Sequence, residues 1–175
     1  MGIWWERLGS FSSVFARLAL GLGFLSAVAD RLGWWGPLGR PNVAWGNFAK
    51  FVEYTGKLNW YLPRALLPAL AVISTCAEIL LGFLLLVGWK TRITALCSGA
   101  LLVTLGTAMT MALGLETPLN FSVFSAAGRS LLLAACTRFP FSADELNQLA
   151  RQQKASRADE SSTSTAIRPS ERDHK

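Results

Sequence analysis

Residues 66–89 form an apolar run, LLPALAVISTCAEILLGFLLLVGW, with a single charged side chain, Glu78, near its middle. A helix of about 20 apolar residues crosses the roughly 30 Å hydrocarbon core of a bilayer, so this run predicts a membrane-spanning helix. An ionisable group at that depth costs at least about 3 kcal/mol unless it is paired, hydrated or neutral. The run therefore constrains the whole chain: it indicates a membrane protein, and it requires partners for Glu78 in other segments.

Three further apolar runs, residues 11–29, 93–115 and 119–137, are also long enough to span a bilayer. Of the 175 residues, 51% are hydrophobic and only 16% are charged, with a mean hydropathy of +0.34, as is typical of membrane proteins. The sequence thus predicts an all-α, polytopic membrane four-helix bundle.

The predicted bundle occupies residues 1–141 and is followed by a polar segment, residues 142–175. The first loop, residues 31–63, is too long to be only a connector. Within it, residues 43–57 alternate apolar and polar positions at helical spacing. This pattern predicts an amphipathic helix lying at the membrane surface. The polar segment lacks apolar periodicity after Leu149, so we expect it to be mostly disordered.

The net charge of +6 does not indicate nucleic acid. Residues 142–175 carry equal numbers of basic and acidic side chains, so the excess lies around the ends of the apolar runs, where lipid headgroups are the expected contact. Basic residues in the turn 90–92 and after residue 137 favour two cytoplasmic termini, although the cations of the first loop oppose this.

Residues 18–29 also match a cleavable signal peptide, because Ala27-Val28-Ala29 precedes Asp30 in the manner of a cleavage site. We expect the segment to be retained, because Arg17 lies deep inside the apolar run. Small buried hydrophobes are the interpretation for Cys76, Cys97 and Cys136; the alternative, a redox pair, requires apposed helices. No metal site is predicted.

Two arginines, Arg17 and Arg129, are the candidate partners for Glu78. At about 1.5 Å per residue, all three lie in the half of the bundle nearer the termini. Ser74 shares a helix face with Glu78, and Ser125 shares one with Arg129. We predict a buried charge centre with one uncompensated positive charge. It either fixes helix pairing, or binds an anionic or quinone-like ligand with Glu78 taking up a proton, or lines a permeation path.

The chain resembles the DoxX family of small four-helix membrane proteins over roughly residues 11–138. The matching stretches are RLALGLGFLSAVADRLG, which begins at Arg17, and AEILLGFLLLVGWKTR, which contains Glu78. The resemblance implies that the protein is integral to the cell membrane, in this case a bacterial inner membrane. It also implies an association with a quinone- or thiol-linked redox system. Many members have a lone basic residue where this chain has Asp30-Arg31.

The leading hypothesis is therefore an accessory subunit of a membrane redox system that contacts quinone and a soluble or membrane oxidoreductase partner. No independent catalytic motif supports an enzyme, since His pairs, C-x-x-C and a nucleotide-binding glycine motif are lacking. The alternatives are a small anion carrier or channel, and a structural anchor that recruits a soluble enzyme. A homo-oligomer is compatible with each.

Overall fold

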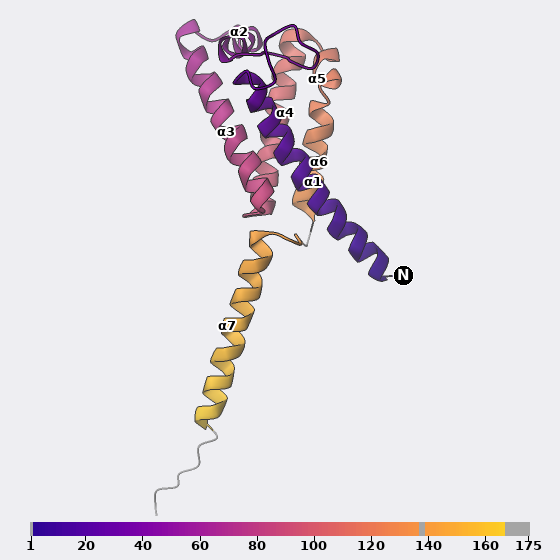
Figure 1. The fold of residues 1–175 in the computed structure, drawn as a ribbon, viewed down its shortest axis with the longest axis vertical. Helices are drawn as coiled ribbons and strands as arrows, with labels where there is room; N and C mark the ends of the chain where they lie inside the picture. Colours follow the sequence, from indigo (N-terminus) through magenta and orange to yellow (C-terminus); the bar gives the residue numbers. More distant parts are fainter. Residues whose placement is uncertain (1, 137–138, 167–175) are drawn as a thin grey trace, which may run out of the picture.

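The computed structural model describes residues 2–136 and 139–166, and these contain helices and no strand. Most of the chain before residue 136 forms a helical bundle, and a final helix projects from one end of it (Figure 1). The helices are α1 (Gly2–Arg31), α2 (Phe48–Leu58), η1 (Arg64–Leu66), α3 (Leu67–Val87), α4 (Thr91–Leu113), α5 (Glu116–Asn120), α6 (Val123–Ala135) and α7 (Ala143–Ala166).

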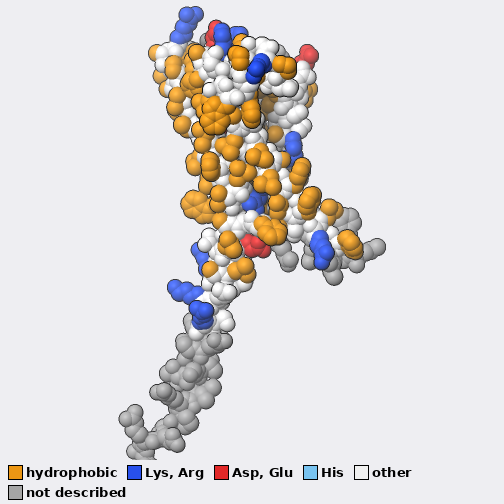
Figure 2. Space-filling view, viewed as in Figure 1, with side chains coloured by type: hydrophobic (Ala, Val, Ile, Leu, Met, Phe, Trp, Pro, Cys, Tyr) orange, Lys and Arg blue, Asp and Glu red, His pale blue; other side chains and the backbone are white. Residues whose placement is uncertain are grey.

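Three of these helices are long and apolar enough to cross a membrane. They coincide with α1 from Arg7 onwards, with η1 and α3 together, and with α4. Figure 2 shows hydrophobic side chains covering the visible middle of the bundle, whereas basic and acidic side chains gather mainly at its ends and along α7. Three of the four predicted spans are thus helices with the length and composition that a membrane crossing requires.

The fourth predicted span, residues 119–137, is not one continuous helix. The structure divides it into α5 and α6 at Ser122, which has a left-handed backbone with φ 55°. The 13 residues of α6 extend about 20 Å, less than the thickness of the hydrocarbon. Pro118, Asn120 and Ser122 disfavour a helix interior at this point. The predicted end at Thr137 lies outside the described residues.

Helices α1 and α3 approach closely through facing glycines. A Cβ on Gly21 would lie 2.9 Å from the carbonyl oxygen of Gly82, and a Cβ on Gly82 would lie 3.2 Å from that of Gly21. Small residues permit such backbone contact between membrane helices. Since α1 and α3 run in opposite directions, this contact fixes which residues of the two helices lie at the same depth (Figure 1).

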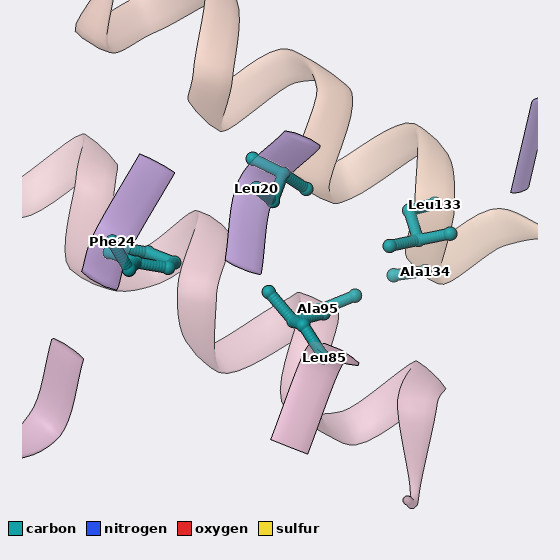
Figure 3. Packing of buried hydrophobic residues seen from close by; sticks show 6 residues of the cluster. All are labelled: Leu20, Phe24, Leu85, Ala95, Leu133 and Ala134. Atoms are coloured by element: carbon teal, nitrogen blue, oxygen red, sulfur yellow. The ribbon is translucent and has the colours of Figure 1, made fainter. Parts of the chain in front are cut away.

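The buried hydrophobic cluster joins α1, α3, α4 and α6 (Figure 3). It consists of Leu20, Phe24, Leu85, Ala95, Leu133 and Ala134. Its position between the four helices means that α6, although short, completes the packing of the three longer ones.

The amphipathic helix predicted over residues 43–57 begins later, at Phe48. Asn47 caps it, because its side-chain oxygen accepts a hydrogen bond from the backbone N–H of Lys50 at 2.9 Å. Helix α2 lies across the end of the bundle opposite α7 (Figure 1). Phe51, Thr55 and Leu58 are its buried residues, as expected for a helix with one apolar face.

The prediction of disorder after Leu149 is wrong up to Ala166, because α7 continues that far. The start of the helix resembles a capping box. The Ser142 hydroxyl accepts from the N–H of Glu145 at 3.1 Å, and the Glu145 carboxylate accepts from the N–H of Phe141, the residue before the cap, at 2.8 Å. Residues 143–166 contain neither Gly nor Pro and many good helix formers. The prediction for residues 167–175 falls outside the described part.

Candidate functional site

Glu78 is buried inside the bundle and forms an ion pair with Arg31, the last residue of α1. Arg31 Nη2 lies 2.8 Å from Glu78 Oε1, and the side chains of the two residues are only 5% and 3% exposed. Arg31 Nη1 also donates to the hydroxyl of Thr75 at 3.2 Å. The charge at bilayer depth is thus compensated within α1 and α3.

The guanidinium of Arg31 also lies over two aromatic rings of the first loop and α2. Its central carbon is 3.8 Å from the ring centroid of Phe51 and 5.1 Å from that of Trp45. Cations in such positions are attracted to the ring face. Arg31 therefore ties α2 and the loop to the centre of the bundle, and Arg31 Nε is buried without a hydrogen-bond acceptor among the described residues.

Asp30, the neighbour of Arg31, holds the loop by its backbone. Its carboxylate accepts hydrogen bonds from the N–H groups of Ala44 at 2.9 Å, Trp45 at 3.1 Å and Gly46 at 3.3 Å. A carboxylate that accepts several backbone N–H groups is a strong local constraint. Together, Asp30 and Arg31 place Trp45 beside the buried ion pair.

Arg17 does not reach Glu78, which corrects the predicted charge centre. Arg17 is buried and donates to the carbonyls of Leu85 and Leu86 at the end of α3 and of Pro140 and Phe141 before α7. Arg17 therefore links the C-terminal end of α3 to the segment before α7.

Arg129 does not reach Glu78 either, because it lies exposed on the outer face of α6. Arg129 Nε donates one long hydrogen bond, 3.5 Å, to the carbonyl of Ser125 in its own helix. Ser125 is likewise exposed, and the hydroxyl of Ser74 donates to the carbonyl of Ala71, one turn back in α3. The predicted cluster of two arginines around one glutamate, with its surplus positive charge, is wrong.

Side-chain direction explains which arginine pairs with Glu78. Side chains of a helix tilt towards its N-terminus. In the antiparallel α1 and α3, Arg31 therefore points towards the middle of the bundle and Glu78 points up to meet it. The Gly21–Gly82 contact puts the two Cα atoms about 9 Å apart along the bundle axis, a gap that two long side chains bridge. Arg17 tilts away from Glu78.

A cavity of about 360 Å³ opens at the α2 end of the bundle, and Trp45, which lies beside Arg31 of the ion pair, is part of its wall. Its size falls in the usual range for small-ligand sites, roughly 300 to 1,000 Å³. Aromatic and charged side chains line it together: Leu38, Ala44, Trp45, Lys50, Glu53, Tyr54, Lys57 and Phe121. The break between α5 and α6 is what brings Phe121 to this site.

Two titratable groups of this cavity have defined protonation states. The hydrogen bond from Lys50, 2.7 Å long, together with the charge of Lys50, lowers the pKa of Glu53, so the carboxylate stays ionised. Burial raises the pKa of Tyr54, so its hydroxyl stays protonated at neutral pH. Lys50 is paired with Glu53, so the ammonium of Lys57, the hydroxyl of Tyr54 and the indole N–H of Trp45 are the other side-chain donors of the cavity wall.

None of the three cysteines is among the residues that line the cavity. Cys76 and Cys97 are exposed on the bundle surface, which corrects the prediction that they are buried; a lipid environment accommodates a thiol as readily as a protein core does. In the described part of the chain, no group of three or more His, Cys, Asp or Glu side chains is placed to hold a metal ion.

The sequence contained a signal for the true centre that the helix heights alone missed. Asp30-Arg31 directly follows the first apolar run, where the predicted first loop starts. An arginine at the end of a membrane helix usually extends towards water. The opposite orientation follows here from the aromatic residues Trp45 and Phe51, which close over it from the loop side.

Comparison with known proteins gives no assignment: no family model, curated protein or solved structure matches this chain.

Proposed function

We propose that this chain is an accessory subunit of a quinone-linked redox system in the membrane, as its resemblance to the DoxX family implies. Two stretches support the resemblance, the one from Arg17 to Gly33 and the one around Glu78. The three apolar helices support a place in the bilayer.

One observation carries the quinone half of the proposal: Trp45 lies beside the guanidinium of the buried ion pair and also lines the cavity. A quinone ring stacks on an indole face, and its two carbonyl oxygens accept hydrogen bonds. The protonated hydroxyl of Tyr54 and the ammonium of Lys57 are the donors, and the apolar tail of the quinone extends into the bilayer.

Arg31 and Glu78 act here as positioning residues. Arg31 holds Trp45 by its guanidinium and Glu78 holds Arg31, so loss of either side chain lets the wall of the cavity move. The pair itself carries no net charge, which removes the support for the anion-carrier alternative that a surplus positive charge had given.

The test is direct binding of a short-chain quinone to the purified full chain, followed by quenching of tryptophan fluorescence. We expect Tyr54→Phe, which removes one donor, to weaken binding about fivefold to tenfold. Trp60→Phe is the matched control, because Trp60 is 76% exposed and lies outside this cavity. Equal affinity of Tyr54→Phe, Lys57→Met and the unaltered chain contradicts the quinone site.

A structural anchor that recruits a soluble enzyme is the second candidate, and α7 favours it. This helix projects from the bundle (Figure 1), and its described side chains from Glu145 to Arg157 are exposed. Deletion of residues 150–175 leaves the bundle intact; if it also releases a soluble oxidoreductase from the membrane while quinone binding persists, α7 is the recruiting element.

A further inference from the structure

Arg129 lies near the middle of the membrane-spanning part of the protein. Helices α4 and α6 run in opposite directions: Gly99 faces Leu131 and Ser130, and Gly106 faces Phe124. These contacts put Arg129 level with residues 100–101 of α4 (Thr91–Leu113). At 1.5 Å per residue, that level is about 14 Å from the nearer end of α4.

At this depth Arg129 faces outwards. The residues of α6 that enter the core are Ala127, Ser130, Leu133 and Ala134. On the opposite side, Ser125, Gly128, Arg129 and Leu132 are exposed and lie at helical spacings of three and four residues; we name them the Arg129 face. A guanidinium turned towards hydrocarbon is costly, and such residues normally meet a partner or a polar cavity.

The shape of the Arg129 face suits close packing of another helix. A Cβ on Gly128 would meet nothing within 4 Å, and Ser125 beside it is also small. Leu132 is 72% exposed one turn further on. Small residues next to a polar one are the arrangement by which membrane helices approach each other and form interhelical hydrogen bonds.

We propose that the Arg129 face binds a membrane-spanning helix of a different chain, and that this helix carries a carboxylate opposite Arg129. Charge complementarity decides the occupant. A carboxylate matches the guanidinium fork in geometry and neutralises its charge.

A second copy of this chain does not offer that carboxylate. The acids within the candidate spans Arg7–Arg31, Arg64–Val87 and Thr91–Leu113 are Asp30 and Glu78, and both are buried and already hydrogen-bonded. A two-fold dimer through the Arg129 face brings two like charges together. Glu53 and Glu116 lie at the α2 end of the bundle, away from the depth of Arg129.

This inference rests on the proposed role as a subunit, since a subunit requires a partner, but not on quinone binding. The Arg129 face is on α6, whereas the cavity lies between α2, the first loop and Phe121. Loss of quinone binding therefore leaves the inference standing, and loss of the partner helix leaves the quinone site standing.

The test uses the full chain in neutral-lipid vesicles and synthetic polyleucine membrane-spanning peptides with Glu, Gln or Leu at the central position. Association is measured by energy transfer between a dye on α7 and a dye on the peptide. We expect the Glu peptide to bind about tenfold more tightly than the Gln or Leu peptides, the scale of one good interhelical polar contact.

Variants assign the effect to one side chain. Arg129→Leu abolishes the preference for Glu, and Arg129→Glu reverses it in favour of a peptide with a central Arg. The matched control is Leu80→Ala on α3, which is exposed to lipid at 59% and leaves the preference unchanged. Far-ultraviolet circular dichroism verifies that each variant is folded.

Three results overturn the proposal. One is equal binding of the Glu, Gln and Leu peptides; the second is self-association of the chain that Arg129→Leu removes, which assigns the face to a second copy. The third is binding of anionic lipid that depends on Arg129, with no preference among the peptides. This result assigns Arg129 to a lipid phosphate. In native membranes, a photo-crosslinker at Leu132 must join an apolar segment that contains Asp or Glu.

Discussion

At the scale of single residues, the dipeptide Asp30-Arg31 connects the end of α1 to both the first loop and α3. The two side chains divide the work: the carboxylate binds the backbone of residues 44–46, and the guanidinium enters the bundle to reach Glu78. Buried pairs are not in themselves strongly stabilising, because desolvation offsets the attraction between the charges. Removal of one partner is a different matter, since it leaves an unpaired charge behind.

We predict that Arg31→Met destabilises the protein by about 3 to 5 kcal/mol, because Glu78 is then buried without its cation. Thermal unfolding in mild detergent measures the loss. The double variant Arg31→Met with Glu78→Leu regains most of it, because neither charge remains.

The control for that cycle combines Arg17→Met with Glu78→Leu. We expect these changes to be additive because, among the described residues, Arg17 donates to backbone carbonyls in α3 and in the segment before α7 and not to Glu78. Coupling of Glu78 to Arg17 rather than to Arg31 contradicts the structure of the centre.

At the scale of helices, the contact of α1 with α3 depends on glycine. A Cβ at position 21 would approach the Gly82 backbone oxygen to 2.9 Å, and a backbone atom cannot rotate out of the way as a side chain can. We predict that Gly21→Ala pushes the two helices apart and costs about 1 to 3 kcal/mol. Unfolding in detergent or lipid measures the change.

Gly23→Ala is the matched control for Gly21→Ala. A Cβ at Gly23 meets nothing within 4 Å, so the substitution gains the helix propensity of alanine, up to about 1 kcal/mol. If both alanines lower stability equally, backbone contact is not what holds α1 against α3.

The start of α7 is fastened to the turn between α3 and α4. Asp144 accepts from the backbone N–H groups of Lys90 and Thr91, both at 2.7 Å, and its own N–H donates to Gly88 at 3.1 Å. Helix α4 has no side-chain cap of its own at Lys90, so Asp144 supplies the cap from a distant part of the chain.

We predict that Asp144→Ala lowers stability by about 1 to 2 kcal/mol, the usual cost of a lost cap, and loosens α7. Hydrogen exchange at the amides of Lys90 and Thr91 measures the first effect, and spin-label distances from α7 to α4 measure the second. Asp144→Asn keeps one acceptor oxygen and retains about half of the stability. Unchanged exchange in both variants contradicts the cap.

Much of the helical framework could be predicted from hydrophobic length alone, but the pairings could not. Runs of apolar residues predict spans, and the turn at Lys90 predicts that α3 and α4 are neighbours. Burial of Glu78 follows from its cost in hydrocarbon. Which arginine meets Glu78 depends on side-chain direction in the antiparallel helices and on Trp45 and Phe51 closing over Arg31. The second of these is a property of the assembled loop. Ser142 and Glu145 form the S-x-x-E pattern of a helix start, whereas the polar composition after Leu149 predicts disorder. Composition alone therefore did not predict α7.

At the scale of the whole molecule, the short α6 still returns the chain to the side from which α1 starts. Arg17 in α1 donates to the carbonyls of Pro140 and Phe141, which directly precede α7. The two ends of the described chain therefore lie on one side of the bundle, and α2 lies at the other (Figure 1).

The predicted topology follows from this arrangement: both termini face one compartment and α2 faces the other. In a variant without native cysteines, single cysteines replace Trp4, Trp60 or Arg151, all exposed in the structure. We expect a membrane-impermeant maleimide added to intact cells to label position 60, and to label positions 4 and 151 only after the membrane is opened. The cationic turn at Lys90 and Arg92 determines this orientation, because basic residues are retained in the cytoplasm.

Two other labelling patterns contradict the prediction. Labelling of 4 and 151 from opposite sides means that α6 does not cross the bilayer. Labelling of both from outside means that the cations of the first loop, not those of the turn, set the orientation.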